Sequence, residues 1–384
     1  MQSRLGPSAL LVALILTGCS SDSGESSSTA NEGSPTTAPA PSTTAVPEPA
    51  QLDLRGLLGA LPAAARPTAS PLFVVAGDLD LATELAGVER PDPEAPGDVD
   101  AMVDWAQSLS GIDRGPVSVS LPQAVGFERL RSNDEIAAEL GWSILDVSAF
   151  IEVQNPPESL AVLEVGTTED ELTAAIGAPS EGVWALGPAE DGDIDMSAIT
   201  PARPLGESLR LGLRDDLLAV SRFTPPVEAF LAEGGETFAD DPQIVEVASA
   251  LEHAGVYSAM FVGATPESET AEPQASGVDP DGPVLAPFDL LGLGLSVMGS
   301  EPLATFVYHH ADEAAASANA DNAERVFRDG LSVRTAAPIA DMLELRDVVV
   351  DGRNVVVTVA FADAAPVNVW QMVYVRELPT VFAP

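Results

Sequence analysis

The chain holds a single cysteine, Cys19, at the end of a short apolar run near its N-terminus. No disulfide can therefore form within the chain, and the residues after Cys19 contain no thiol. Any domain that follows must be stable through the packing of its own side chains. The composition permits this, because 46% of the residues are hydrophobic. Roughly 330 residues remain once a polar segment after Cys19 is set aside, enough for one large domain or two ordinary ones.

The residues before Cys19 have the order of an export signal. One positive charge, Arg4, precedes the apolar residues 9–16. This run is the length of a signal-peptide core and is too short to cross a bilayer of about 30 Å. A plain secretory signal with a chance cysteine is one interpretation of this pattern.

The last four residues of this region favour a second interpretation. Leu16-Thr17-Gly18-Cys19 resembles the lipobox of bacterial lipoproteins, an aliphatic residue and two small residues followed by cysteine. The resemblance implies that residues 1–18 are a lipoprotein signal peptide and that the Cys19 thiol is diacylated with fatty acids such as palmitate. The mature protein would then be anchored to the extracytoplasmic face of the cell membrane.

Residues 20–50 consist mainly of Ser, Thr, Pro, Ala and Gly. Such a segment buries too little apolar surface to offset the entropy of ordering it. Residues 19–50 are therefore predicted to be a lipidated cysteine followed by a disordered tether that spans roughly 30 Å. Whether its Ser and Thr residues carry sugars is left open.

The charge of the chain is strongly acidic, with 59 Asp and Glu against 17 basic residues, all of them Arg. This field repels nucleic acid and anionic lipid headgroups, so neither is an expected partner. The acidity is interpreted mainly as a solubilising surface, and a specific cationic ligand is the alternative. Past Cys19, the tether and the acidic, lysine-free body resemble uncharacterised lipoproteins of high-GC Gram-positive bacteria.

Residues 51–384 are predicted to be a folded body of α+β class, with largely antiparallel sheets and flanking helices. The loop-like composition of 264–283 leaves open a subdivision there. Similar strand–turn–helix segments begin at Leu72, Leu160 and Leu303, which leaves open two duplicated α+β units. Among the predicted elements are capping boxes at Ser132–Glu135 and Thr168–Glu171, a loop at 178–206 with one short element, a half-buried strand at Val117–Leu121, and a last strand at Val367–Val375.

Common catalytic and nucleotide-binding motifs are absent from the sequence. Gly292-Leu293-Gly294 lacks the third glycine of a dinucleotide fingerprint and opens no predicted helix. The sequence therefore predicts no catalytic residue, no cofactor site and no metal site, and enzyme activity is left uncertain.

Four groups of residues could contradict this prediction. Asp78 and Asp80 are interpreted as turn and cap residues, with cation binding or acid–base work as the alternative. Asp191–Asp195 begins like a calcium loop, but Met196 replaces the glycine of an EF-hand and Ala202 its glutamate, which excludes an EF-hand and leaves weak surface binding of calcium as the alternative. His309 and His310 are adjacent on a predicted strand and would point to opposite faces, so they would not readily hold one ion together. They are interpreted as strand-end histidines with their rings in water, and pairing with a carboxylate as a base is the alternative. The four tryptophans are assigned to the core, with a hydrophobic or sugar-binding groove as the alternative: Trp105, Trp142, Trp184 and Trp370.

Three function classes follow. The first is a non-catalytic binding or carrier lipoprotein for a small or apolar envelope ligand, which a large apolar cavity would support. The second is an envelope scaffold or protein-interaction lipoprotein, which an exposed apolar patch would support. The third, a carboxylate-based hydrolase, requires paired acids in a cleft. The identity of a small-molecule or protein partner is not predicted.

Overall fold

The computed structural model describes residues 51–68, 71–92, 99–112, 115–122, 127–263, 283, 285, 287–362 and 365–374. The predicted signal peptide, Cys19 and the tether lie outside the described residues, as does nearly all of the 264–283 segment. Residues 49–384 form one compact unit.

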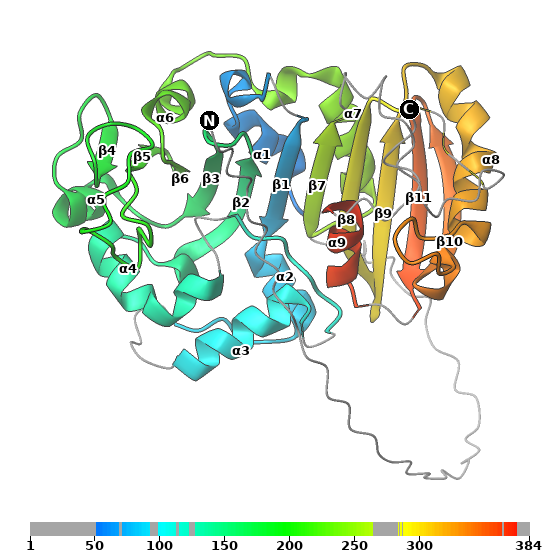
Figure 1. Cartoon of the computed structure of the whole chain (residues 1–384), viewed down its shortest axis with the longest axis horizontal. Coiled ribbons are helices and arrows are strands. Elements are labelled where there is room, and N and C mark those ends of the chain that lie inside the picture. Colours follow the sequence, from blue (N-terminus) through cyan, green and yellow to red (C-terminus); the bar gives the residue numbers. More distant parts are fainter. Residues whose placement is uncertain are drawn as a thin grey trace, which may run out of the picture. The chain divides into compact units, whose positions relative to one another are not determined.

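In the described part of the chain, eleven strands form one sheet in the order β10-β11-β9-β8-β7-β1-β2-β3-β6-β5-β4. Figure 1 shows this order, with β4 near one side and β10 near the other. Every neighbouring pair is antiparallel, which confirms the predicted α+β class and antiparallel pairing. The strands are β1 Phe73–Asp78, β2 Val147–Val153, β3 Leu160–Val165, β4 Val183–Leu186, β5 Leu209–Arg214, β6 Leu217–Ser221, β7 Ser258–Gly263, β8 Leu290–Met298, β9 Glu301–His309, β10 Leu343–Asp351 and β11 Asn354–Phe361.

The sheet separates two hydrophobic clusters, and helices cover both of its faces. Successive side chains of a strand point to opposite faces, so Val75 lies in one cluster and its neighbours Val74 and Ala76 lie in the other. The first cluster is completed by α2–α5, α8 and α9, and the second by α1, α6 and α7. The helices are α1 Leu54–Ala60, α2 Leu79–Ala86, α3 Val99–Ser110, α4 Asn133–Leu140, α5 Glu169–Ile176, α6 Thr224–Leu231, α7 Pro242–His253, α8 Glu313–Asp329 and α9 Val367–Tyr374. Of the helices described, none combines the length and apolar character needed to span a membrane.

The two arms of the sheet repeat one order of elements on either side of the β1–β7 pair. β2, β3, α5 and the β5–β6 hairpin correspond to β8, β9, α8 and the β10–β11 hairpin. The second and third predicted repeat segments are β3–α5 and β9–α8, which occupy equivalent places. The first is β1–α2 at the centre of the sheet. This order does not by itself confirm a duplication.

The predicted last strand, Val367–Val375, is wrong, because residues 367–374 form the helix α9. Its buried residues are Val369, Trp370, Met372 and Val373, a spacing that faces one side of a helix. The β propensity of valine and aromatic residues is weak, and tertiary packing overrides it here.

The predicted strand Val117–Leu121 is also wrong. Val117 and Val119 are buried, but their segment joins no ladder. The Ser118 N–H donates to the Tyr257 hydroxyl at 2.9 Å, and the Val119 N–H donates to the Leu109 carbonyl at 2.8 Å. Hydrogen bonds to a side chain and to the end of α3 thus take the place of hydrogen bonds to a neighbouring strand.

The predicted capping box at Ser132–Glu135 is wrong, whereas the one at Thr168–Glu171 is confirmed. Ser132 precedes α4 but makes no side-chain cap. The adjacent Asn133 is buried, and its side-chain oxygen accepts from the Ile144 N–H and the Ser143 hydroxyl. At Thr168 both reciprocal bonds with Glu171 form.

Candidate functional site

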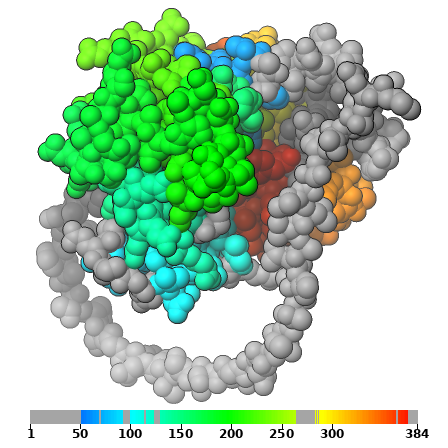
Figure 2. All heavy atoms as spheres, turned by 60° about the vertical axis from the view of Figure 1, so that its left-hand side comes forward, coloured from blue at the N-terminus to red at the C-terminus, as the bar shows by residue number. Residues whose placement is uncertain are grey.

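The loop between β4 and β5, residues 187–208, carries a cluster of exposed apolar side chains. Long loops in compact domains are usually functional or disordered, and this one is described along its whole length. Its part of the chain is coloured bright green and lies at the front of Figure 2. Ten large apolar residues are exposed in the described structure. Four of them lie inside this loop, in the twelve-residue stretch 194–205. We define the apolar patch as Ile194, Met196, Ile199 and Leu205, which are 51%, 64%, 49% and 48% exposed.

Backbone pairing brings these side chains to one end of the loop. Ile194 forms an antiparallel bridge with Glu207, and the Asp195 N–H continues it by donating to the Gly206 carbonyl. Met196 and Leu205 directly follow and precede this paired stretch in the chain. The chain turns back at residues 200–203, where the Thr200 and Arg203 backbones exchange hydrogen bonds, and Ile199 directly precedes this turn.

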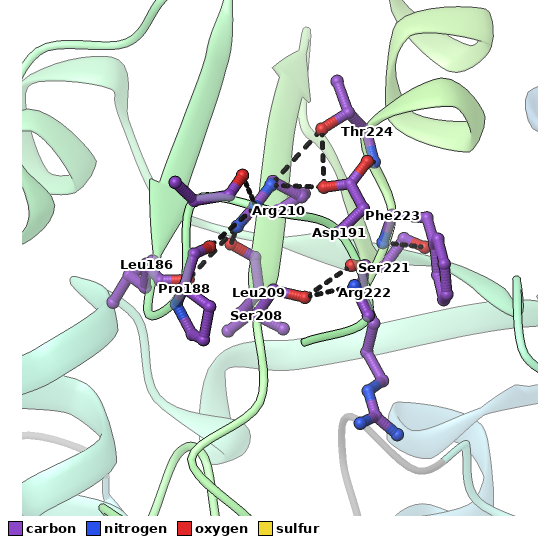
Figure 3. Close-up of polar contacts among 12 residues, drawn as sticks. Leu186, Pro188, Asp191, Ser208, Leu209, Arg210, Ser221, Arg222, Phe223 and Thr224 are labelled. Carbon is purple, nitrogen blue, oxygen red and sulfur yellow. Dashed lines mark hydrogen bonds and ion pairs between the residues drawn. The ribbon is translucent and has the colours of Figure 1, made fainter. Parts of the chain in front are cut away.

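A buried arginine holds the base of the loop (Figure 3). The Arg210 side chain is 3% exposed, and its Nε donates to Asp191 Oδ1 at 3.0 Å. Its two terminal nitrogens donate to four backbone carbonyls, two of which belong to the loop. Arg210 thus satisfies every donor within the protein, which is the arrangement of a structural brace rather than of a ligand site. The four carbonyls are those of Leu186, Pro188, Ala189 and Leu209.

Further contacts hold the two strands of the loop and its outer turn. The Ser208 hydroxyl accepts from the Gly192 N–H and donates to the Arg222 carbonyl, as Figure 3 shows in part. Arg203 pairs with Glu139 of α4 at 3.0 Å, and that arginine side chain is 10% exposed. The apolar patch is therefore presented on a fixed support.

The segment Asp191–Asp195, which begins like a calcium loop, forms part of this support, and its Asp191 and Asp195 carboxylates accept hydrogen bonds from protein groups. Asp191 Oδ1 accepts from Arg210 and from the Thr224 hydroxyl, while Oδ2 accepts from the Thr224 N–H. Asp195 accepts from the Ser197 N–H and hydroxyl, and these bonds lower the pKa of the Asp195 carboxyl.

Asp78 and Asp80 have separate structural roles. Asp78 Oδ1 accepts from the Leu81 N–H at 2.8 Å and caps α2, which supports the predicted cap. Asp80 pairs with Arg90 at 2.8 Å and is 65% exposed. Burial raises the pKa of Asp78, with a smaller contribution from the nearby charge of Asp80.

The two neighbouring histidines are both buried, so the interpretation of strand-end rings in water is wrong. They have different partners. His309 is buried, with Nε2 3.4 Å from Glu246 Oε2 and Nδ1 3.8 Å from Asp289 Oδ2. His310 Nδ1 lies 3.1 Å from the Pro287 carbonyl. The two nitrogens of one imidazole point in opposite directions, so both carboxylates cannot join His309 around one ion. In the residues described, no group of three or more His, Cys, Asp or Glu side chains is placed to hold a metal.

The tryptophans lie in the core, as predicted. Each is 2% or 3% exposed, so these side chains do not line an open groove. Three of the indole N–H groups donate within the protein, to the Thr83 hydroxyl, the Thr173 hydroxyl and the Ser118 carbonyl. The residues are Trp105, Trp142, Trp184 and Trp370.

No protein-family model matches the chain, and no curated protein matches it. A solved structure, crystal form I of TP0453, is similar to it at 10% sequence identity and a TM-score of 0.31. The similarity covers 81% of this chain and 96% of the other. A TM-score this low does not establish a shared fold.

The sequence predicted the loop but not the apolar patch. Ile194, Met196, Ile199 and Leu205 stand among Gly, Pro, Asp and Ser residues, with neither helical nor strand spacing. Large apolar residues inside such a segment were the available signal, and only the structure shows that they are exposed.

Proposed function

We propose that this protein is an extracytoplasmic lipoprotein, held to the membrane through Cys19, whose body is a non-catalytic protein-interaction module. The observation that carries the proposal is the apolar patch on the braced loop 187–208. Contiguous exposed apolar surface on a folded domain is typical of an interaction site. Single exposed apolar residues would not support the same inference.

A binding or carrier role for a small apolar ligand is the alternative. It requires a large apolar cavity with a mouth. The patch favours the interaction module, because its apolar side chains are exposed and none of them belongs to either hydrophobic cluster. A carboxylate hydrolase has less support, since Asp78 caps a helix and Asp80 forms an ion pair.

Photo-crosslinking in the host tests the proposed surface. A photoreactive phenylalanine analogue replaces Met196 in one strain and Met298 in a control strain. These methionines are matched in exposure, at 64% and 66%, and Met298 lies outside the patch in β8. A discrete protein adduct is expected from position 196 alone. The same adducts from both positions, or none from position 196, would show that the patch is not an interaction site.

The anchor has its own test. Cys19→Ala is expected to release the protein from the membrane fraction, because it removes the thiol that lipidation requires. A protein that stays in the membrane with its signal peptide cleaved would rule out the lipid anchor. Native mass spectrometry of the chain purified from its host addresses the carrier alternative, which a co-purified lipid would support.

A further inference from the structure

We infer that the protein partner of the apolar patch presents an amphipathic segment in which Lys or Arg residues flank apolar side chains. This inference rests on the proposed function and adds the chemistry of the partner. It follows from the charges that surround the patch and from how each of them is engaged.

The exposed charge of the loop is entirely negative. Glu190, Asp193 and Asp195 are exposed, and Asp195 stands between Ile194 and Met196 in the chain. None of the three forms an ion pair with a basic residue in the described structure.

The two arginines that brace the loop, Arg203 and Arg210, are already engaged in ion pairs. Arg203 pairs with Glu139, and Arg210 pairs with Asp191, and their side chains are only 10% and 3% exposed. Arg203, the one basic residue of loop 187–208, is thus paired with Glu139 and forms no ion pair with the carboxylates that flank the patch.

These charges restrict what can cover the patch. A neutral apolar partner would bury Ile194 and Met196 but would remove water from neighbouring carboxylates without pairing them, which is unfavourable. Cationic side chains at the edge of the contact form charge-assisted hydrogen bonds with the same carboxylates. They also speed association, because the potentials of the two surfaces are complementary.

The same charges disfavour two other occupants. An anionic bilayer would bring lipid phosphates against Glu190, Asp193 and Asp195, and like charges repel. A second copy of the chain, docked patch to patch, would bring the same carboxylates together. A cationic segment of another protein fits both the apolar and the charged part of the surface.

Peptide binding to the full chain carrying Cys19→Ala tests the inference. Two labelled helical peptides share one leucine spacing, and their polar positions are all Lys in one and all Glu in the other. Fluorescence anisotropy is expected to show about tenfold or greater preference for the Lys peptide at low salt, with a loss of that preference as salt screens the charges.

Variants separate binding at the patch from general attraction to an acidic protein. The pair Ile194→Ser and Met196→Ser should weaken Lys-peptide binding about tenfold, while the control Met298→Ser should leave it unchanged. The pair Glu190→Gln and Asp193→Asn should weaken binding and flatten its salt dependence. Unaltered melting temperatures show that the variants are folded. Equal binding by the patch variant and the parent would overturn the inference.

Three further outcomes distinguish this inference from the proposed function. A photo-adduct at position 196 together with preference for the Glu peptide would leave the interaction module standing and overturn the cationic partner. Sedimentation with phosphatidylglycerol vesicles that Met196→Ser abolishes would assign the patch to lipid. A dimer in light scattering that Met196→Ser dissociates would assign it to a second copy. Either of the last two results overturns the inference.

Discussion

Arg210 Nε and Asp191 Oδ1 lie 3.0 Å apart beneath the loop that carries the apolar patch. The arginine extends from β5, and the aspartate belongs to the loop itself, so this contact joins the rigid sheet to the exposed surface. Asp191 also accepts from the backbone N–H of Thr224 at the start of α6. The pair therefore fixes the loop relative to a strand and a helix at once.

Replacing Arg210 with Ala is expected to destabilise the protein by about 3–5 kcal/mol, because the carboxylate of Asp191 and four backbone carbonyls lose their buried donor. Urea unfolding at pH 7 measures the change. Arg346→Ala is the control, since Arg346 pairs with Glu301 and Glu344 at the exposed surface and should change stability little. An equal effect of both substitutions would show that Arg210 does not brace the loop.

Gly292→Ala is expected to cost about 1–3 kcal/mol, because a methyl group there overpacks the contact between β8 and α7. A Cβ at Gly292 would clash with Val247 Cγ1 and lie 3.2 Å from Leu251 Cδ1. Thermal unfolding checks this, with Gly166→Ala as control because a Cβ at Gly166 meets no atom within 4 Å. A stability cost no greater than that of Gly166→Ala would mean that α7 does not require the close approach.

The sequence alone predicts part of the fold, but it does not predict the role of Gly292. The strands on both sides of the hairpin at Asp351-Gly352-Arg353 were predictable, because turn residues interrupt runs of β-branched side chains. The packing of α7 against Gly292 was not, because it depends on which strand each helix crosses. The order of the eleven strands likewise depends on contacts between residues far apart in sequence.

Part of the candidate site could likewise be predicted from the sequence, and part could not. The loop was evident from its composition, and Trp105 was correctly assigned to the core. The strand predicted at 367–375 failed because its valines satisfy both a strand pattern and one face of a helix. Exposure of Met196 depends on how the loop is supported, which no local pattern encodes.

Asp78→Asn is expected to stabilise the protein at pH 7. Burial raises the pKa of Asp78 above its usual value of 3.8, so the folded state holds this proton to higher pH than the unfolded state. The stability associated with the proton is present below pH 3.8 and is lost as the pH rises through the folded pKa. Asparagine caps a helix as well as aspartate does and carries no charge.

The measurement is the urea midpoint of Asp78→Asn and the parent at pH 7 and again near pH 3. The gain should be present at pH 7 and absent at the lower pH. Asp312→Asn is the matched control, since Asp312 caps α8 through the Ala315 N–H and is exposed. A destabilised Asp78→Asn variant at pH 7 would contradict the assignment of Asp78 as a half-buried cap whose charge is unfavourable in the folded state.

His309→Gln is expected to reduce the loss of stability on mild acidification. Burial is the largest cause that lowers the pKa of His309 below 6.5, with Arg353 adding to it and Glu246 and Asp289 opposing it. The unfolded state therefore gains a proton at higher pH than the folded state does. The stability of the folded protein falls as the pH drops from 6.5 toward the folded pKa.

Urea midpoints measured between about pH 5 and 7 give the slope that a histidine produces. It should be shallower in His309→Gln than in the parent, and shallower still when His310 is also replaced, because burial lowers the pKa of His310 as well. His253→Gln is the control, because His253 is exposed at the end of α7. The pKa of Glu246 is lowered, chiefly by its hydrogen bond with Arg353, so that group loses its contribution only below pH 4.5 and does not affect this slope. A slope that persists in the double variant would place the acid sensitivity outside the histidine pair.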